Sequence, residues 1–287
     1  MRTGMGPVAV LASLALIFAQ GCSTRPGGRG DVYDTRIRAE TQLELGNRQA
    51  DRGDLDAALA LLDEAMRFAV LADDSGLRVR AGLSRGNVLL SLGRADEARA
   101  GMNLAVEEAL RTGDRELAAL ARIHEARRRL LSPGGAGAAG GVVEEVSREM
   151  ALLRDPVQVA FAWTVVALAE GELGRYDRAE AAARRSLAAH ERGRRLELAA
   201  FDWFMIASFR SRSGDFAGAR LALEASMSLD RRVENSWGLA SGWRALGDVE
   251  RRAGNPDAAR AAYARASEIF RALGNYRAAD EALSRVE

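Results

Sequence analysis

The sequence predicts an all-α fold, an α-solenoid of about six stacked helix-turn-helix repeats of 40 residues, and two observations carry that prediction. The first is composition: Ala, Leu, Arg and Glu dominate a chain of 287 residues with only 5 Pro, which favours helix over sheet. The second is a period: Gly recurs every 40 or 41 residues, and Ala follows it five positions later. A period of roughly 20–50 residues marks stacked units that bury their apolar faces only against one another. The six glycines are Gly53, Gly93, Gly134, Gly174, Gly214 and Gly254, and the six alanines are Ala58, Ala98, Ala139, Ala179, Ala219 and Ala259.

The first 21 residues have the pattern of a secretory signal peptide. Arg2 supplies a positive end, and an apolar run follows from Pro7 to Ala19. At about 1.5 Å per residue, a helix of this length reaches only about 20 Å, short of the roughly 30 Å bilayer core. We therefore expect residues 1–21 to direct export rather than to span a membrane.

The residues around the expected cleavage point, FAQGCST, resemble the signal of a bacterial lipoprotein, in which a small residue precedes a lipidated Cys. Gly21 and Cys22 match that pattern, whereas Ala19 and Gln20 depart from the usual Leu and small residue. The resemblance implies that Cys22 carries the lipid, and Ser23 after it implies an outer-membrane lipoprotein that faces the periplasm. The alternative is an ordinary secretory signal that contains the one Cys of the chain.

Residues 22–36 are rich in Gly and polar side chains and are expected to form a flexible tether, so that the solenoid spans residues 37–287. Within the units, the position seven residues before the central Gly is small in five of six cases, and Arg127 is the exception. A small residue there lets two antiparallel helices approach closely, because a larger side chain would push them apart. The central Gly fits the short turn between those helices.

These columns resemble the tetratricopeptide repeat, whose pattern runs Trp-x-x-Leu-Gly, then a turn Gly, Ala, an aromatic residue and Ala. The resemblance covers roughly residues 37–287 and implies paired helices stacked into a curved rod. The period of 40 exceeds the family's usual period of about 34, so we expect longer helices. The last full unit carries the pattern in Trp243, Leu246, Gly247, Gly254, Ala259, Tyr263 and Ala266, and the first unit carries it in Leu45, Gly46, Gly53, Ala58, Leu62 and Ala65.

The third unit is degenerate. The stretch SPGGAGAAGG, residues 132–141, replaces the normal turn and the start of the second helix. Each Gly inside a helix costs about 1 kcal/mol, so we expect a loop there and a shortened helix over residues 142–153. Asp155 and Pro156 predict the start of the next helix, with Asp as N-cap and Pro in the first turn. The tail, residues 274–286, repeats the turn-and-helix pattern and is expected to cap the stack.

The resemblance implies that the first helices line a concave face that binds a peptide or a partner protein. Asn47 and Asn87 occupy equivalent places there, and Asn recurs at this place in members that clamp peptides. Arg80 and Arg128 would add charge-assisted hydrogen bonds to a carboxylate, and His124 is expected on the same face. Those members use Lys beside Asn, and this chain has no Lys. The alternative is that these are ordinary solvated helix residues.

Aromatic residues gather in the second half of the chain. Phe161, Phe201 and Phe204 are expected on the inner face together with Arg244, where exposed Phe side chains would form an apolar patch suited to a partner helix or strand. The alternative is that the longer repeat turns them into the core. Three Trp residues match a core column and a fourth fits no column: Trp163, Trp203 and Trp243, and then Trp237.

The composition limits the kinds of ligand and reaction that we expect for this chain. The net charge is +1, from 41 basic and 40 acidic residues, whereas nucleic-acid binders carry a basic excess. Without Lys there is no Schiff-base or phosphate-loop lysine, and a chain with one Cys and two His does not favour a His-based metal site. We therefore expect no metal, cofactor, nucleic acid or small-molecule substrate, and membrane contact only through the lipid anchor.

Catalysis has little support in the sequence. His124 and His190 are far apart, and no Ser or Cys nucleophile is marked near either. We therefore expect a non-catalytic interaction scaffold or assembly factor of the bacterial cell envelope, which binds a protein or peptide on its concave face. Two alternatives stay open: an envelope enzyme on a helical-repeat scaffold, and a periplasmic signalling or oligomerisation scaffold.

Overall fold

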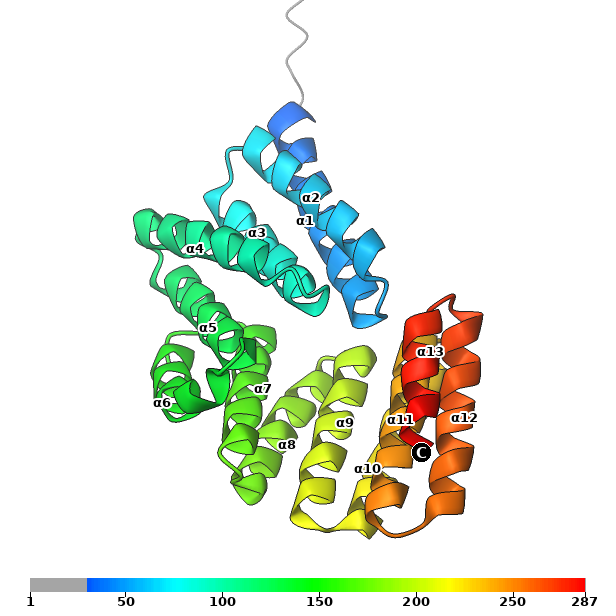
Figure 1. Ribbon diagram of the computed structural model, residues 1–287. Coiled ribbons are helices and arrows are strands. Elements are labelled where there is room, and N and C mark those ends of the chain that lie inside the picture. The colour runs from blue at the N-terminus through cyan, green and yellow to red at the C-terminus, as the bar shows by residue number, and fades with distance from the viewer. Residues whose placement is uncertain (1–29, 287) are drawn as a thin grey trace, which may run out of the picture.

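The computed structural model describes residues 30–286, and within this range the chain is helical and contains no strand. Six helix pairs follow one another and curve into a solenoid, as Figure 1 shows from the N-terminal α1 to the C-terminal α13. Helices in sequence order pack side by side, which confirms the predicted all-α solenoid of six repeats.

Each repeat has a first helix and a second helix joined by a short turn. The first helices are α1 (Gly30–Asp51), α3 (Ser75–Ser91), α5 (Arg115–Leu131), α7 (Pro156–Glu172), α9 (Leu196–Ser213) and α11 (Ser236–Arg252). The second helices are α2 (Leu55–Leu71), α4 (Ala95–Thr112), α6 (Ala139–Met150), α8 (Tyr176–Arg192), α10 (Phe216–Arg232) and α12 (Pro256–Ala272). A last helix, α13 (Tyr276–Leu283), covers the end of the stack, and two 3₁₀ helices are η1 (Gly135–Ala138) and η2 (Ser284–Val286).

The central glycines make the turns between paired helices. In the sixth repeat Gly254 has φ +81°, a left-handed conformation that side chains with a Cβ disfavour. The amide of Asn255 then donates to the carbonyl of Glu250, which satisfies a backbone group at the end of α11. The other five central glycines also have positive φ. The same amide-to-carbonyl bond closes five of the six turns, whereas in the third repeat α5 is followed by Ser132 in an extended conformation and the Gly135 amide donates to the Ser132 carbonyl.

The small residues lie where the two helices of a repeat touch. The alanine five positions after each central Gly is buried in all six repeats, and the most accessible, Ala259, is 4% exposed. A Cβ added to Gly247 would lie 2.5 Å from the Tyr263 ring, and one added to Gly46 would lie 2.8 Å from Leu62. Close approach of the paired helices therefore depends on these positions, as the spacing predicts.

The three column Trp residues pack against the core and are each covered by an Arg. The Arg185 guanidinium lies 4.4 Å from the Trp163 ring centroid, and that of Arg265 lies 5.0 Å from Trp243. Arg184 covers Trp203 at 5.9 Å. Each Arg thus shields one face of a half-buried ring while its charge stays near water.

Two boundaries differ from the sequence prediction. Helix α1 begins at Gly30, so residues 30–36 are helical and do not belong to the expected tether. Arg36 in this stretch pairs with Asp74 at 3.2 Å, a contact that holds the start of α1 against the second repeat. Residues 22–29, with Cys22, lie outside the described residues, as does the expected signal peptide.

The third repeat also differs in detail. After the turn at Gly134, η1 covers residues 135–138, and α6 begins at Ala139 rather than at the expected residue 142. Ala139 is fully buried, so packing holds a helix start that contains Gly140 and Gly141 despite their poor helix propensity. Asp155 accepts a hydrogen bond from the Val157 amide and Pro156 begins α7, as predicted.

The stack curves so far that its first turn reaches its fifth and sixth repeats. Arg52, after α1, lies 3.8 Å from Glu197 at the start of α9, and Gly53 lies against the ring of Trp237 in α11. Figure 1 shows this end of α1 and α2 beside α9 and the C-terminal helices. Between residues 30 and 286, no helix is both long enough and apolar enough to cross a membrane.

Candidate binding site on the inner face

The first helices form the inner side of the curve. Consecutive first helices contact one another in the pairs α1–α3, α3–α5, α5–α7 and α9–α11, and within residues 30–286 no two second helices do so to the same extent. Elements on the inside of a bent stack lie closer together than those outside, so side chains of the first helices face the concave surface. A site on this face would draw its residues from several repeats.

Three side chains from the second and third repeats form a polar cluster there. Asn87 of α3 lies 3.0 Å from Nδ1 of His124 in α5 through its side-chain nitrogen. The Oδ1 atom of the same amide accepts a hydrogen bond of 2.9 Å from Arg127, one helical turn further along α5. Asn87 therefore links the two α5 side chains and fixes their relative positions.

The protonation states of this cluster follow from its contacts. Because Arg127 only donates, it faces the carbonyl oxygen of Asn87, and the amide NH₂ is left to donate to His124 Nδ1. Enclosure by protein, together with the charge of Arg127, lowers the pKa of His124 to about 3. The imidazole is therefore neutral near pH 7, with its proton on Nε2.

Arg127 has an unusual electrostatic environment. Enclosure lowers the pKa of its guanidinium to about 10, so it still carries a full charge at neutral pH. Its hydrogen-bond partner is the neutral Asn87, and no carboxylate within residues 30–286 pairs with it. Most other Arg side chains of α5 are paired, for example Arg122 with Glu149 at 3.2 Å. The cluster thus presents an uncompensated positive charge on the inner face.

Aromatic rings extend the site toward the fourth and fifth repeats. The Phe161 ring of α7 stacks on His124, with centroids 4.3 Å apart and planes at 24°. Phe204 of α9 is half-buried against the core, and Phe201 on the same helix is 45% exposed. The inner face therefore carries a polar, positively charged part beside an apolar part.

Other predicted site residues lie elsewhere or are already engaged. Arg128 forms a two-point pair with Glu125 at 2.6 and 2.8 Å, so its charge is satisfied within α5. Asn47 is exposed and has no side-chain hydrogen bond within the described chain, so it does not reproduce the role of Asn87. Arg244 lies over the Phe270 ring at 5.6 Å. Arg80 is half-buried and makes no ion pair within residues 30–286.

The residue that sequence reasoning missed is Arg127. It occupies the column that is small in the other five repeats, and that exception was the available signal. A long charged side chain cannot fit between two closely packed helices, so it had to point elsewhere. The structure shows that it reaches back to the second repeat.

A second histidine lies in a set that has the residue types of a hydrolase. Asp202 Oδ2 lies 2.6 Å from His190 Nδ1, and Ser186 Oγ lies 3.4 Å from the same ring nitrogen. A catalytic triad places its carboxylate and its nucleophile on opposite ring nitrogens. Ser186 is fully buried and also contacts Thr164 at 3.0 Å. This set is a buried hydrogen-bond network that joins α7, α8 and α9.

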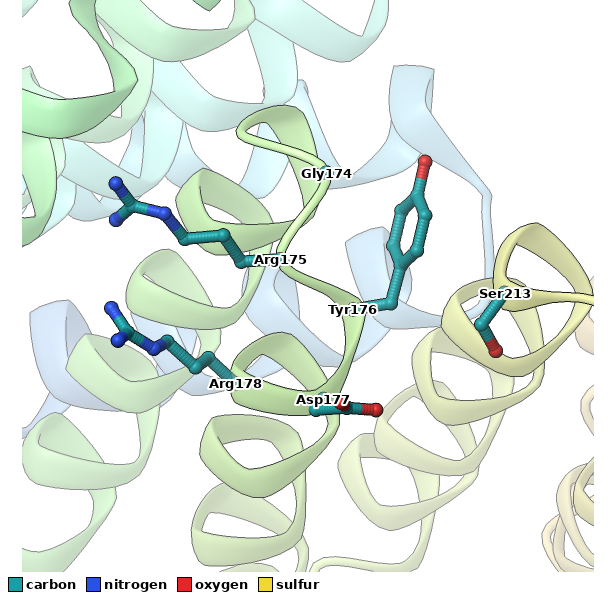
Figure 2. A pocket seen from close by; sticks show the side chains of 6 residues that line it. All are labelled: Gly174, Arg175, Tyr176, Asp177, Arg178 and Ser213. Carbon is teal, nitrogen blue, oxygen red and sulfur yellow. The ribbon is translucent and has the colours of Figure 1, made fainter.

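A surface hollow lies apart from the inner-face cluster. It has a volume of about 320 Å³ and lies at the turn of the fourth repeat, lined by Gly174, Tyr176 and Ser213 among others. In Figure 2, Arg175 and Arg178 extend to the side opposite Ser213, so the polar groups around the hollow do not converge. In the described part of the chain, no group of three His, Cys, Asp or Glu side chains is placed to hold a metal ion.

Comparisons with known proteins identify the fold. No protein-family model and no curated protein matches the chain. Among solved structures, the chain is similar to a Rap protein complexed with Competence and Sporulation Factor, with a TM-score of 0.57, 12% identity, and coverage of 87% of this chain and 74% of that one. It is also similar to PilW, described as a widely conserved type IV pilus biogenesis factor, with a TM-score of 0.52, 18% identity, and coverage of 86% and 97%.

A third structure names the repeat. The chain is similar to a signal-transduction ATPase with a tetratricopeptide repeat sensor from Pyrococcus horikoshii, with a TM-score of 0.51 and 12% identity, over 89% of this chain and 42% of that one. At sequence identities this low, the structural similarity supports a shared fold and nothing further. The chain has the tetratricopeptide-repeat fold.

Proposed function

We propose that this chain is a non-catalytic interaction scaffold, and that its inner face binds a protein partner through a segment that presents a carboxylate. The carboxylate would lie on Arg127 and His124, and an adjoining apolar group would lie on Phe161. One observation carries the proposal: the charge of Arg127 is held on the inner face without a carboxylate of its own within residues 30–286.

The chemistry of the cluster favours an anionic group over a neutral one. A guanidinium presents donors in a planar fork that matches a carboxylate, and such charge-assisted bonds are about twice as strong as neutral ones. Nε2 of His124 carries the imidazole proton and has no partner within residues 30–286, so it offers one more donor. A partner carboxylate would relieve the enclosed charge of Arg127 and accept from His124 at the same time.

The similar structures support the general class of function. One is a Rap protein in complex with Competence and Sporulation Factor, and another is a pilus biogenesis factor. The first is a complex of this fold with another factor, and the second is a factor in the assembly of a surface structure, which supports an interaction or assembly role. Neither identifies a partner for this chain, because the likeness is one of fold.

The test starts from a photo-crosslinking residue at Phe201, which captures partners from envelope membranes for identification by mass spectrometry. The affinity of the identified partner is then measured for Arg127→Ala. We expect a loss of tenfold or more, because a partner carboxylate would lose its charged donor. Arg122→Ala is the matched control on α5, since Arg122 pairs with Glu149, and we expect less than a twofold change.

The proposed contact also requires a free carboxylate on the partner. If a partner peptide with its carboxylates converted to amides binds wild-type protein as tightly as the acid form, the carboxylate assignment is wrong. Equal affinities of wild type and Arg127→Ala would also contradict it. Partner capture that depends on the aromatic residues alone would then point to an apolar surface.

We also propose that the chain is an outer-membrane lipoprotein held in the cell envelope through Cys22. The support is the FAQGCST stretch, in which the one Cys of the chain follows a small residue. Cys22→Ala is expected to move the protein from the membrane fraction to the periplasmic fraction. Retention of this variant in the membrane would contradict the anchor.

A further inference from the structure

The contact between the first repeat and the last two repeats is unusual for a solenoid. In repeat proteins each unit contacts only its neighbours. Here the turn after α1 meets α9 and α11: Arg52 lies 3.8 Å from Glu197, and Gly53 lies against Trp237. This contact adds nothing to the stacking of adjacent repeats. It joins the two ends of the curve on either side of the inner face.

Trp237 and Gly53 make a contact that the other turns between paired helices lack. Trp237 fits no column of the sequence, and its ring meets Phe270 edge-on at 5.2 Å on one side and Gly53 on the other. A Cβ at position 53 would overlap the Trp237 ring. At the other five turn glycines nothing lies within 4 Å of an added Cβ, namely at Gly93, Gly134, Gly174, Gly214 and Gly254. The first turn alone is fitted to a distant side chain.

The contact is weak enough to open. The ion pair between Arg52 and Glu197 is long, and its side chains are 46% and 22% exposed, so it contributes about 0–1 kcal/mol. The rest is one aromatic ring resting on a glycine turn. The repeats themselves are held by buried clusters of apolar side chains, and of the residues at this contact only Trp237 packs against one of them. The ends can therefore separate while every helix pair stays folded.

Charges at the contact also limit its strength. Enclosure by protein and the negative charge of Glu197 raise the pKa of Asp51 to about 7, while His190 and Arg195 lower it. Asp51 is the last residue of α1 and precedes Arg52. An ionised Asp51 therefore works against the attraction between Arg52 and Glu197.

We propose that the turn at Asp51–Gly53 and its seat on Glu197 and Trp237 form a clasp, which holds the solenoid closed around its inner face and opens to admit a protein partner. The closing contact is supported by the Arg52–Glu197 and Gly53–Trp237 contacts. The role in admitting a partner rests on the proposed function. The two parts are tested separately, and neither test needs a known partner.

The first test measures the distance across the clasp. Spin labels on Asp56→Cys in α2 and Arg232→Cys in α10, both exposed positions, are introduced into the full chain with Cys22→Ser. Wild-type clasp residues are expected to give a narrow distribution of distances by pulsed electron paramagnetic resonance. Gly53→Asn is expected to give a longer and broader one, because Asn tolerates positive φ but its Cβ would overlap Trp237.

Gly93→Asn is the matched control. It introduces the same residue into the same turn conformation, φ +76° against +78°, with nothing near the added Cβ. We expect this variant to keep the narrow distribution and to have a melting temperature close to that of Gly53→Asn. If both variants shift the distance equally, turn strain explains the effect and the clasp is wrong. If Gly53→Asn keeps the wild-type distance, the clasp is wrong as well.

The second test measures access to the inner face. Phe201→Cys places a thiol at an exposed inner-face position on α9, and Leu104→Cys places one on the second helix α4. A maleimide carrying a long polyethylene glycol chain is compared with N-ethylmaleimide. We expect Gly53→Asn to accelerate the bulky reagent at position 201 by fivefold or more and to leave position 104 unchanged. Equal rates at position 201 in closed and opened protein would overturn the gating role, whether or not Arg127 binds a carboxylate.

Discussion

The third and sixth repeats share one sequence register but differ in the residue that stands where the two helices of a repeat touch. In the sixth, Gly247 lets α11 and α12 approach until the Tyr263 ring fills the space where a Cβ would stand. In the third, Arg127 takes the equivalent position, and its side chain leaves the helix interface for Asn87 of the preceding repeat. The second helix is also shorter there, 12 residues in α6 against 17 in α12. A repeat that gives up close packing at one position can place a charged group on the inner face.

The largest expected effect comes from placing an arginine in a regular repeat. Ala167 is the fully buried counterpart of Arg127 in the fourth repeat. Ala167→Arg should lower the free energy of unfolding by about 3 kcal/mol or more, because it overpacks the helix pair and buries an unpaired charge. Arg127→Ala should change it by less than about 1 kcal/mol. Urea unfolding of both variants makes the comparison, and equal losses would show that the third repeat is packed like the rest.

A smaller effect is expected at the altered turn of the third repeat. A Cβ on Gly135 would overlap the carbonyl of Leu130, so Gly135→Ala should cost about 1–3 kcal/mol. Gly137→Ala in the same 3₁₀ helix is the control, since nothing lies within 4 Å of its added Cβ. Thermal unfolding of the two variants distinguishes them. Similar melting temperatures would mean that this turn is not a fixed part of the fold.

The last expected effect concerns pH and the third repeat. His124 has a pKa of about 3 in the folded chain, below its ordinary value of 6.5. Between pH 6.5 and pH 3 this side chain is therefore protonated in the unfolded chain but neutral in the folded chain. Stability from this residue is therefore present above pH 6.5 and falls as the pH drops toward 3. His124→Gln, which cannot titrate, should lose stability less steeply between pH 6.5 and 4. Parallel pH curves for the two proteins would contradict this assignment.

The helix pairs could be predicted from the sequence because close packing leaves a local mark. A residue such as Ala98 or Gly86 must be small wherever two helices touch, and the repeat returns that requirement at a fixed interval. The turn glycines mark the chain in the same way, because their positive φ excludes most side chains. Five or six copies of each requirement make the period visible without an alignment.

The inner-face site could be predicted only in part. Asn87, His124 and Phe161 were placed on one face by their register, and the structure brings them together. The role of Arg127 could not be read from its column, because its direction depends on a neighbouring repeat. The pairing of Arg128 with Glu125 is not visible in the register either, because the sequence pattern leaves that charge free. Pairing is decided by three-dimensional neighbours, which a single register does not specify.

The same contrast between crowded and open turns has a practical side. A Cβ added at Gly93, Gly174, Gly214 or Gly254 would have no atom within 4 Å, so these four turns point into open space. An affinity tag or a fluorescent peptide spliced into one of these four turns would hang from the edge of the rod and leave its helices untouched. The turn at Gly53 offers no such opening, since any added residue there would press on an indole ring.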